Sequence, residues 1–367
     1  MADIELIAPA KTVTVTFSLE PAHNVLSSLF LINEAEDTSG LHDWVYQTAA
    51  ALSPDRQRHN RLVCHFFGAE ALLDRHSWPG FPAWLDHLAA QEPTAMRDRI
   101  LEDFIRHVAR KLDSGEAIAI PTPAELLADR ATYLALIERV YASKGGTPDL
   151  SLCETAHALF NDPPALKDLI LTHLGWMWEA HLAAEWERNL PTLRETVAAF
   201  QQLDYAGLSL AGAIRRTVGR EVPAAWEEWT GAIDHIIFLP SAHIGPYLLE
   251  MEGDETSARI VFGARLPGGV AARPSALSRT ELQMRLSALA DDTRLQILRL
   301  LAQEGELCAQ DIMARLGLSQ SAASRHLRQL SATGYVLERR RDGAKCYRLN
   351  RERMNDTLNA LLHFLQE

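Results

Sequence analysis

The chain has 367 residues, of which 36 are Lys or Arg and 48 are Asp or Glu, so its formal net charge at pH 7 is −12. A composition with 47% hydrophobic and 23% charged residues is typical of globular proteins and excludes the disordered and fibrous classes. No apolar run approaches the roughly 18 residues of a membrane span, and Asp3 and Glu5 stand where a secretory signal would be basic. We therefore expect a cytoplasmic protein with two or more domains that binds no membrane.

Residues 1–265 predict an α+β domain that is large and mostly helical. A strand is expected over residues 12–19, where polar and apolar residues alternate. Helix starts are marked by Ser53, by Thr122 and by a capping box over residues 151–154. Residues 235–266 predict further strands, the last two of which form a hairpin. We expect a small sheet in which the first strand pairs with this hairpin.

Residues 266–278 predict a linker, because two glycines and two prolines interrupt every helical or strand period there. The charge divides at the same place. From Arg279 onward there are 14 Lys and Arg against 11 Asp and Glu, a net charge of +3, whereas the preceding residues carry −15. The acidic average therefore hides a basic C-terminal domain over residues 279–367, and only this domain suits a nucleic acid.

The C-terminal domain predicts a winged helix-turn-helix. A helix after the N-cap Ser319 is expected to end at Gly334, and Asp342 and Gly343 favour a two-residue hairpin turn. The elements expected in chain order are helices over residues 280–290, 291–301 and 309–317, the helix after Ser319, a hairpin over residues 335–349 and a last helix over residues 351–366. The third and fourth helices would make the helix-turn-helix and the basic hairpin the wing.

The fourth helix of this domain has two different faces. Spacings of three and four residues place the members of each set on one side. The polar and cationic side carries Ser321, Ser324, Arg325 and Arg328, and the apolar side carries Ala323, Leu327 and Leu330. Small hydroxyl residues allow close approach, and arginines supply forked donors for phosphates and guanine edges. The polar side is therefore either a DNA-reading surface or an ordinary solvated helix face.

Three stretches of the last quarter of the chain resemble the winged-helix repressors of the ArsR type, in order and spacing: ALADDTRLQILRLL, ELCAQDIMARLGLSQSAASRHLRQLSATGYV and RRRDGAKCYRL. The resemblance implies a homodimer paired through the first and last helices of this domain, with each fourth helix in the major groove of a double-stranded DNA operator. Carried over by position, the residues facing DNA are Gln320, Ser321, Ser324 and Arg325, with Arg341 and Lys345 in the wing. We add Arg328 because it shares their helix face.

A metal site is not expected. The thiolate sensors of the family carry two cysteines separated by one residue at the start of the third helix. Here Cys308 takes the place of the first cysteine, and Gln310 stands where the second would be. One thiolate is a poor metal site, so we predict no metal and no cofactor. The four cysteines lie far apart in sequence and favour reduced thiols. A redox pair of Cys308 with Cys346 is the alternative.

The function expected for the whole chain is that of a transcriptional regulator, a repressor that binds a palindromic operator as a homodimer. No phosphate-binding glycine loop and no nucleophile motif is present, so we do not expect an enzyme. The N-terminal domain is expected to bind a small organic effector in a pocket lined by Trp176, Trp178, His181, Trp186, Phe238 and Tyr247. Three alternatives remain: an enzyme with an appended DNA-binding domain, a partner-binding module, or a domain that only strengthens dimerisation.

Overall fold

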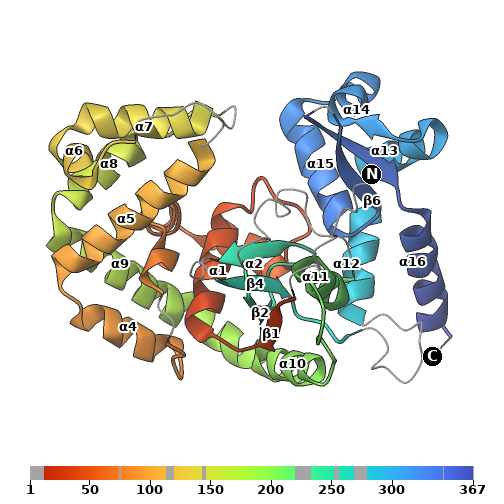
Figure 1. Cartoon of the computed structure of the whole chain (residues 1–367), viewed down its shortest axis with the longest axis horizontal. Helices are drawn as coiled ribbons and strands as arrows, with labels where there is room; N and C mark the ends of the chain where they lie inside the picture. Colours follow the sequence, from red (N-terminus) through yellow and green to blue (C-terminus); the bar gives the residue numbers. More distant parts are fainter. Residues whose placement is uncertain are drawn as a thin grey trace, which may run out of the picture. The chain divides into compact units, whose positions relative to one another are not determined.

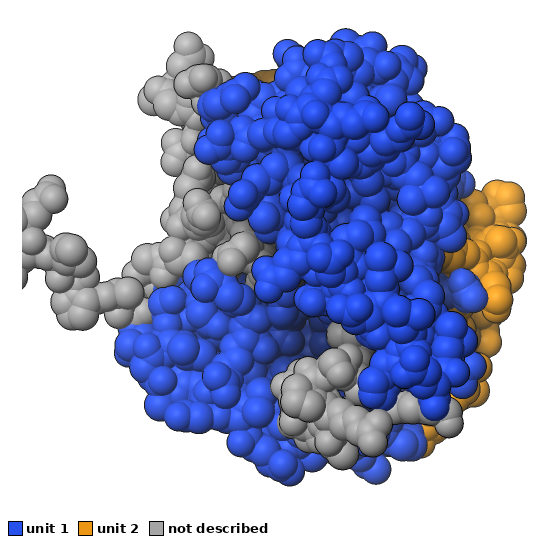
Figure 2. All heavy atoms as spheres, turned by 90° about the vertical axis from the view of Figure 1, so that its right-hand side faces the viewer, with its two compact units in different colours: residues 1–19, 35–43, 189–367 blue, residues 20–34, 44–188 orange. Residues whose placement is uncertain are grey.

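The computed structural model describes residues 12–73, 76–112, 120–142, 146–219, 233–251, 256–267, 279–341 and 343–366. It has an α+β fold, mostly helical with two small sheets (Figure 1), and this confirms the predicted fold class. Contacts divide the chain into two compact units, coloured in Figure 2. Unit 1 comprises residues 1–19, 35–43 and 189–367, and unit 2 comprises residues 20–34 and 44–188. No helix in the described ranges is both long and apolar enough to cross a membrane.

Unit 2 is helical. Its helices are α1 (Pro21–Asn33), α2 (Asp43–Ala51), α3 (Pro54–Arg61), α4 (Phe81–Ala90), α5 (Pro93–Leu112), α6 (Pro123–Ala128), α7 (Arg130–Ala142), α8 (Leu150–Phe160), α9 (Pro163–Met177) and the start of α10 (Ala183–Gln201). Leu62–Phe66 and Trp178–Leu182 are π-helical, and Ala69–Leu72 is a short 3-10 helix. The large side chains Trp84, Phe67 and Phe160 are fully buried in this unit, so its stability comes mainly from apolar burial.

Two predicted caps are present and one is replaced. The Ser53 hydroxyl accepts the backbone N–H of Arg56, and Thr122 forms a capping box with Glu125. The capping box predicted over residues 151–154 is wrong. The carboxylate of Asp149 instead accepts the backbone N–H of Ser151, so that α8 begins at Leu150. A carboxylate acceptor at the N-cap is favoured by the positive end of the helix dipole.

The first sheet lies in unit 1. Its strands are β1 (Thr14–Phe17), β2 (His235–Ser241), β3 (Leu248–Met251) and β4 (Ser257–Gly263), in the order β1-β2-β4-β3. The hairpin β3–β4 is antiparallel, as expected, but β1 pairs in parallel with β2 and not with the hairpin. The end of α10 and the helix α11 (Leu210–Val218) pack against the sheet through a core that includes Phe17, Phe200 and Ile214 (Figure 1).

The winged helix-turn-helix follows in unit 1. Its elements are α12 (Arg279–Leu289), α13 (Asp292–Glu304), β5 (Leu307–Cys308), α14 (Ala309–Leu316), α15 (Gln320–Ala332), β6 (Val336–Arg341), β7 (Ala344–Leu349) and α16 (Arg351–Phe364). The three strands form a sheet in the order β5-β7-β6. Ile297, Ile312, Leu330 and Tyr335 lie in its buried core. Each predicted helix and the predicted hairpin are therefore present.

The domain boundary remains a prediction. Of the predicted linker, residues 268–278 lie outside the described residues. The division into domains of residues 1–265 and 279–367 therefore rests on the sequence alone. Contacts group the first sheet with the winged helix-turn-helix in unit 1.

Candidate nucleic-acid interface

Local signals position α15 on the domain. The Ser319 hydroxyl accepts the backbone N–H of Ala322 at 3.2 Å, as an N-cap does. Gly317 ends α14 with φ 64° and Gly334 follows α15 with φ 80°. Both lie in the left-handed region that favours glycine. These residues fix where α15 begins and ends. The position of the helix in turn determines which of its side chains face solvent.

The two faces of α15 differ in burial as predicted. Ala323, Leu327 and Leu330 are buried in the domain core. The other face is exposed and carries Gln320, Ser321, Ser324, Arg325 and Arg328. A face with two arginines and small hydroxyl residues can enter a groove and donate hydrogen bonds to base edges and phosphates. The exposure is what DNA contact requires, while the contact itself remains a prediction.

The C-terminal half of α15 contacts the segment Thr38–Gly40, a contact not anticipated from sequence. The Ser39 hydroxyl donates to the side-chain oxygen of Gln329, and Nη1 of Arg328 lies 3.4 Å from the hydroxyl of Thr38. A Cβ at Gly40 would lie 2.6 Å from Nε2 of Gln329, so the segment approaches the helix closely. Arg328 is thus the one residue of the predicted α15 set with a side-chain bond to this segment among the described residues.

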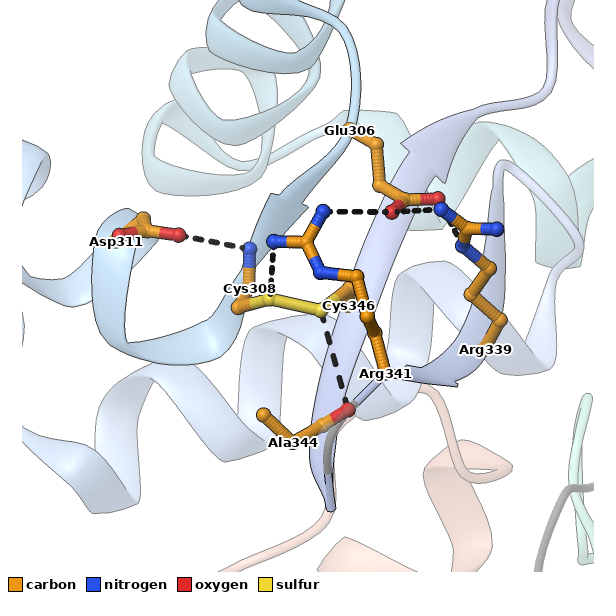
Figure 3. The surroundings of a disulfide bond; sticks show 7 residues. All are labelled: Glu306, Cys308, Asp311, Arg339, Arg341, Ala344 and Cys346. Carbon is orange, nitrogen blue, oxygen red and sulfur yellow. Dashed lines mark hydrogen bonds and ion pairs between the residues drawn. A yellow bond between two sulfur atoms is a disulfide. The ribbon is translucent and has the colours of Figure 1, made fainter.

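The wing carries basic residues that are paired with acids. Arg339 is paired with Glu306 through a hydrogen bond of 2.7 Å, and Nη1 of Arg341 lies 3.6 Å from the same carboxylate (Figure 3). Nζ of Lys345 lies 2.9 Å from Glu338. The hydrogen bond from Arg339 holds the pKa of Glu306 below its usual value. The exposed Arg341 and Lys345 therefore offer less net charge than their number suggests.

A disulfide joins the wing to the start of the helix-turn-helix. Cys308 in β5 and Cys346 in β7 are directly opposite in the antiparallel ladder and are bonded to each other (Figure 3). The expectation of four reduced thiols was therefore wrong for this pair, because strand pairing brings together residues 38 apart in sequence. Cys64 and Cys153 are free and buried. No group of three or more potential metal ligands occurs within the described ranges.

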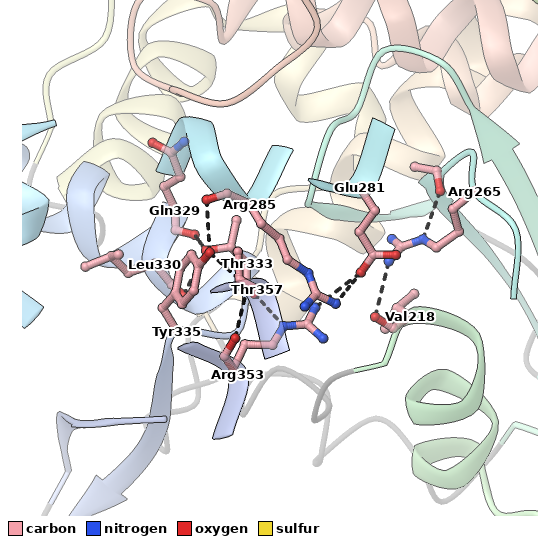
Figure 4. A network of polar contacts seen from close by, with 11 residues as sticks. Val218, Arg265, Glu281, Arg285, Gln329, Leu330, Thr333, Tyr335, Arg353 and Thr357 are labelled. Carbon is pink, nitrogen blue, oxygen red and sulfur yellow. Dashed lines mark hydrogen bonds and ion pairs between the residues drawn. The ribbon is translucent and has the colours of Figure 1, made fainter. Parts of the chain in front are cut away.

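A buried ionic cluster holds α12, α16 and the end of α15 together (Figure 4). Glu281 of α12 lies 2.6 Å from Arg285 and 3.6 Å from Arg353 of α16. The positive charges of Arg265 and Arg285 lower the pKa of Glu281, which burial alone would raise. Nη1 of Arg265 also donates to the carbonyl of Val218 at the end of α11. The cluster therefore extends from the winged helix-turn-helix to the first sheet within unit 1.

The predicted effector-pocket residues lie in both units. In unit 2, the Trp176 ring packs edge-on against His181 at 5.1 Å, Trp178 packs on Phe81 at 5.1 Å, and Trp186 is half-buried. In unit 1, Phe238 is fully buried against Phe17 and Phe262, and the Tyr247 hydroxyl donates to the carbonyl of Ser39. The ring of Phe238 is thus occupied by core packing. A pocket shared by all six residues remains a prediction.

The order of α13, α14, α15 and the β6–β7 hairpin defines a winged helix-turn-helix protein. The family model described as "Bacterial regulatory protein, arsR family" matches residues 291–337. The arsenical resistance operon repressor of Staphylococcus aureus is 35% identical over 85 residues, which cover 23% of this chain and 81% of that protein. The chain belongs to the arsR family of bacterial regulatory proteins.

Two further similarities cover comparable shares of the chain. The arsenic resistance transcriptional regulator ArsR1 of Pseudomonas putida is 47% identical over 64 residues, covering 17% of this chain and 50% of that protein. The crystal structure of a "possible transcriptional regulatory protein" fragment from Mycobacterium bovis is 32% identical, with a TM-score of 0.20, and covers 24% of this chain and 95% of that one. The chain spans about half the length of the first curated relatives it matches.

Proposed function

We propose that the protein is a transcriptional repressor that binds a palindromic operator in double-stranded DNA. The observation that carries this proposal is the exposed face of α15, where Arg325 and Arg328 stand among small hydroxyl residues while the opposite face is buried. Arginine donors on a closely approaching helix suit guanine edges and phosphates. The relatives matched by this region are named as repressors of arsenical resistance operons, which supports a regulatory role for the same fold here.

The protein binds DNA as a homodimer in this proposal. Helix α16 and its C-cap residue expose Leu358, Leu362 and Leu365, with 48%, 58% and 71% of their surfaces accessible. Their spacing places them on one side of the helix. An apolar stripe of this kind can pack against the identical stripe of a second copy related by two-fold symmetry, which removes both from water. Two subunits would then present two α15 helices to successive major grooves.

An organic effector adjusts operator affinity through the N-terminal residues, which act as a binding module and not as an enzyme. The buried core of the winged helix-turn-helix includes Ile297, Ile312, Leu330 and Tyr335, all of which belong to that domain. The residues before Arg279 carry a net charge of −15, which repels a duplex. The contact of Thr38–Gly40 with α15 provides a route by which N-terminal residues act on the DNA-reading helix. An effector must bind the DNA-bound and free forms with different affinity to exert this control.

Selection from a random duplex library tests the proposal. The full chain, immobilised at moderate salt, is expected to enrich an imperfect palindrome whose half-sites are about one helical turn apart. Sedimentation of the complex should give two protein chains per duplex. Enrichment of no sequence, or of a single half-site bound by one chain, would contradict the proposed function.

A further inference from the structure

Unit 2 contains a cavity between α3 and α9 with a volume of about 470 Å³. Helix α3 contributes Asp55, Arg56 and His59 to its lining, and α9 contributes Asp168, Leu169 and His173. This volume lies within the range of roughly 300–1,000 Å³ that small-molecule sites occupy. Asp55 and Asp168 are exposed and His173 is fully buried. The cavity therefore has carboxylates at its rim and an imidazole at its floor.

The hydrogen bonds of Asn60 determine which nitrogen of His173 carries a proton. Nδ2 of Asn60 lies 2.9 Å from the carbonyl of Leu29, which can only accept, so this atom is the amide nitrogen. The amide oxygen then faces Nε2 of His173 at 3.0 Å. Because an amide oxygen only accepts, Nε2 must be the protonated nitrogen. Nδ1 of His173 is left with a bare lone pair.

That lone pair is unpartnered and buried. Nδ1 of His173 has no hydrogen-bond partner among the described residues, although the side chain is fully buried. Burial, with the nearby His59 and Arg56, lowers the pKa of His173 to about 3, so the ring stays neutral at physiological pH. A buried acceptor without a donor is costly. A ligand with an N–H or O–H group would remove this cost.

The charges of the lining favour a cationic ligand. Burial and the charge of Arg56 also lower the pKa of His59, which is therefore neutral at pH 7. The formal charges then come from Asp55 and Asp168 against Arg56 alone. The guanidinium of Arg56 already lies 4.1 Å from the centre of the Trp176 ring, a cation–π contact. Among the lining residues, two carboxylates thus face one guanidinium.

We propose that this cavity binds a small organic amine. Its ammonium group is neutralised by Asp55 and Asp168 at the rim, its hydrocarbon body packs against Leu169, and an N–H or O–H group at its other end donates to Nδ1 of His173 at the floor. Each lining group then has a complementary partner on the ligand. That the amine is also the organic effector rests on the proposed function, whereas the binding itself does not.

Three probes of similar size and different charge test the binding: benzylamine, benzyl alcohol and benzoate. Calorimetric titration of the full chain without DNA should give a lower dissociation constant for benzylamine than for the other two. In protein labelled with ¹⁵N in histidine, the Nδ1 resonance of His173 should move on addition of benzylamine. Tighter binding of benzoate than of benzylamine would contradict the proposal and indicate an anion site at Arg56. Binding of none of the three probes would also overturn it.

Variants assign the binding to this cavity. The double variant Asp55→Asn and Asp168→Asn should weaken benzylamine binding about tenfold, as expected from two exposed ion pairs. Asp86→Asn is the matched control, because Asp86 is exposed on α4 in the same unit and does not line the cavity. Thermal unfolding shows whether each variant folds. Equal weakening in the control, or none in the double variant, would exclude the site.

The same samples separate this inference from the proposed function. Operator affinity is measured with and without saturating benzylamine. Amine binding that leaves operator affinity unchanged would contradict an effector role at this site but not the binding. A chain that binds benzylamine but no operator would contradict the proposed function alone.

Discussion

Nε of Arg353, in the first turn of α16, donates a hydrogen bond of 3.0 Å to the carbonyl of Thr333, the C-cap residue of α15. The same guanidinium lies 3.6 Å from Glu281. One side chain therefore satisfies a carbonyl at the end of the candidate DNA-reading helix and belongs to the buried ionic cluster. Carbonyls at a helix C-terminus lack partners within the helix, so the contact stabilises the placement of α15.

Arg353→Ala is expected to lower the free energy of unfolding by about 1–3 kcal/mol. The substitution leaves the Thr333 carbonyl without its donor and removes one of the positive charges that face Glu281, although Arg285 remains. Urea unfolding followed by circular dichroism measures the change. Arg299→Ala is the control, because Arg299 is exposed on α13. Equal effects of the two substitutions would show that the contact with Thr333 stabilises nothing.

Arg325→Ala should weaken operator binding by roughly 1–3 kcal/mol and relax the preference for one base pair. Arg325 is exposed on the reading face of α15, so its loss should not affect folding. Competition binding with operators altered at single positions measures both effects. If Arg325→Ala binds every altered operator as the unmodified chain does, Arg325 does not read bases.

Arg341→Ala should weaken binding to all duplexes alike and lower the magnitude of the salt slope by about 1 or less. A full unit is the upper limit, because Glu306 already lies 3.6 Å from this guanidinium. Titrations at several salt concentrations measure the slope. An effect that depends on sequence would make Arg341 a base contact and contradict its assignment to phosphate.

Glu306→Gln should increase affinity for any duplex and steepen the salt slope, since Arg339 and Arg341 lose their acidic partner. The hydrogen bond from Arg339 lowers the pKa of Glu306. A carboxylate with a lowered pKa keeps its pairing above its ordinary pKa and loses it as the pH falls through the lowered value. The gain in duplex affinity of Glu306→Gln over the unmodified chain should therefore be constant between pH 6 and 8. Glu352→Gln, an exposed change on α16, is the control and should have a smaller effect.

Reduction of the Cys308–Cys346 disulfide should lower the free energy of unfolding by about 2–4 kcal/mol, because the bond closes a loop in the unfolded chain. Urea unfolding with and without dithiothreitol measures the change. The double variant Cys308→Ser and Cys346→Ser should unfold at the same urea concentration in both conditions. A shift in that variant would assign the effect of the reductant to Cys64 or Cys153 instead.

Leu362→Glu should convert the proposed dimer into a monomer, since it places a charge in the middle of the apolar stripe of α16. Sedimentation velocity measures the mass. Leu295→Glu is the matched control, because Leu295 is also exposed, to 48%, but lies on α13. Dissociation by Leu295→Glu and not by Leu362→Glu would move the interface to α13.

Local signals in the sequence predicted most of the winged helix-turn-helix. Ser319 caps α15, Gly334 ends it, and Gly343 forms the hairpin turn with φ 80°. These features depend on residues within four or five positions of one another, because caps, turns and helix faces are set by backbone conformation and short hydrogen bonds. Competition between neighbouring caps is harder to predict, as Asp149 shows by replacing the expected cap at Ser151.

The sequence by itself therefore determined the class of the C-terminal domain and the face of α15 that is exposed. Only the tertiary structure decided the partners of that face and the chemistry of the α3–α9 cavity. Arg328 meets Thr38 across 290 positions, and His173 meets Asn60 across 113. Such pairs carry no short-range periodicity, because packing of distant segments brings them together. The buried lone pair of His173 exists only because Asn60, held by Leu29, dictates which ring nitrogen is protonated.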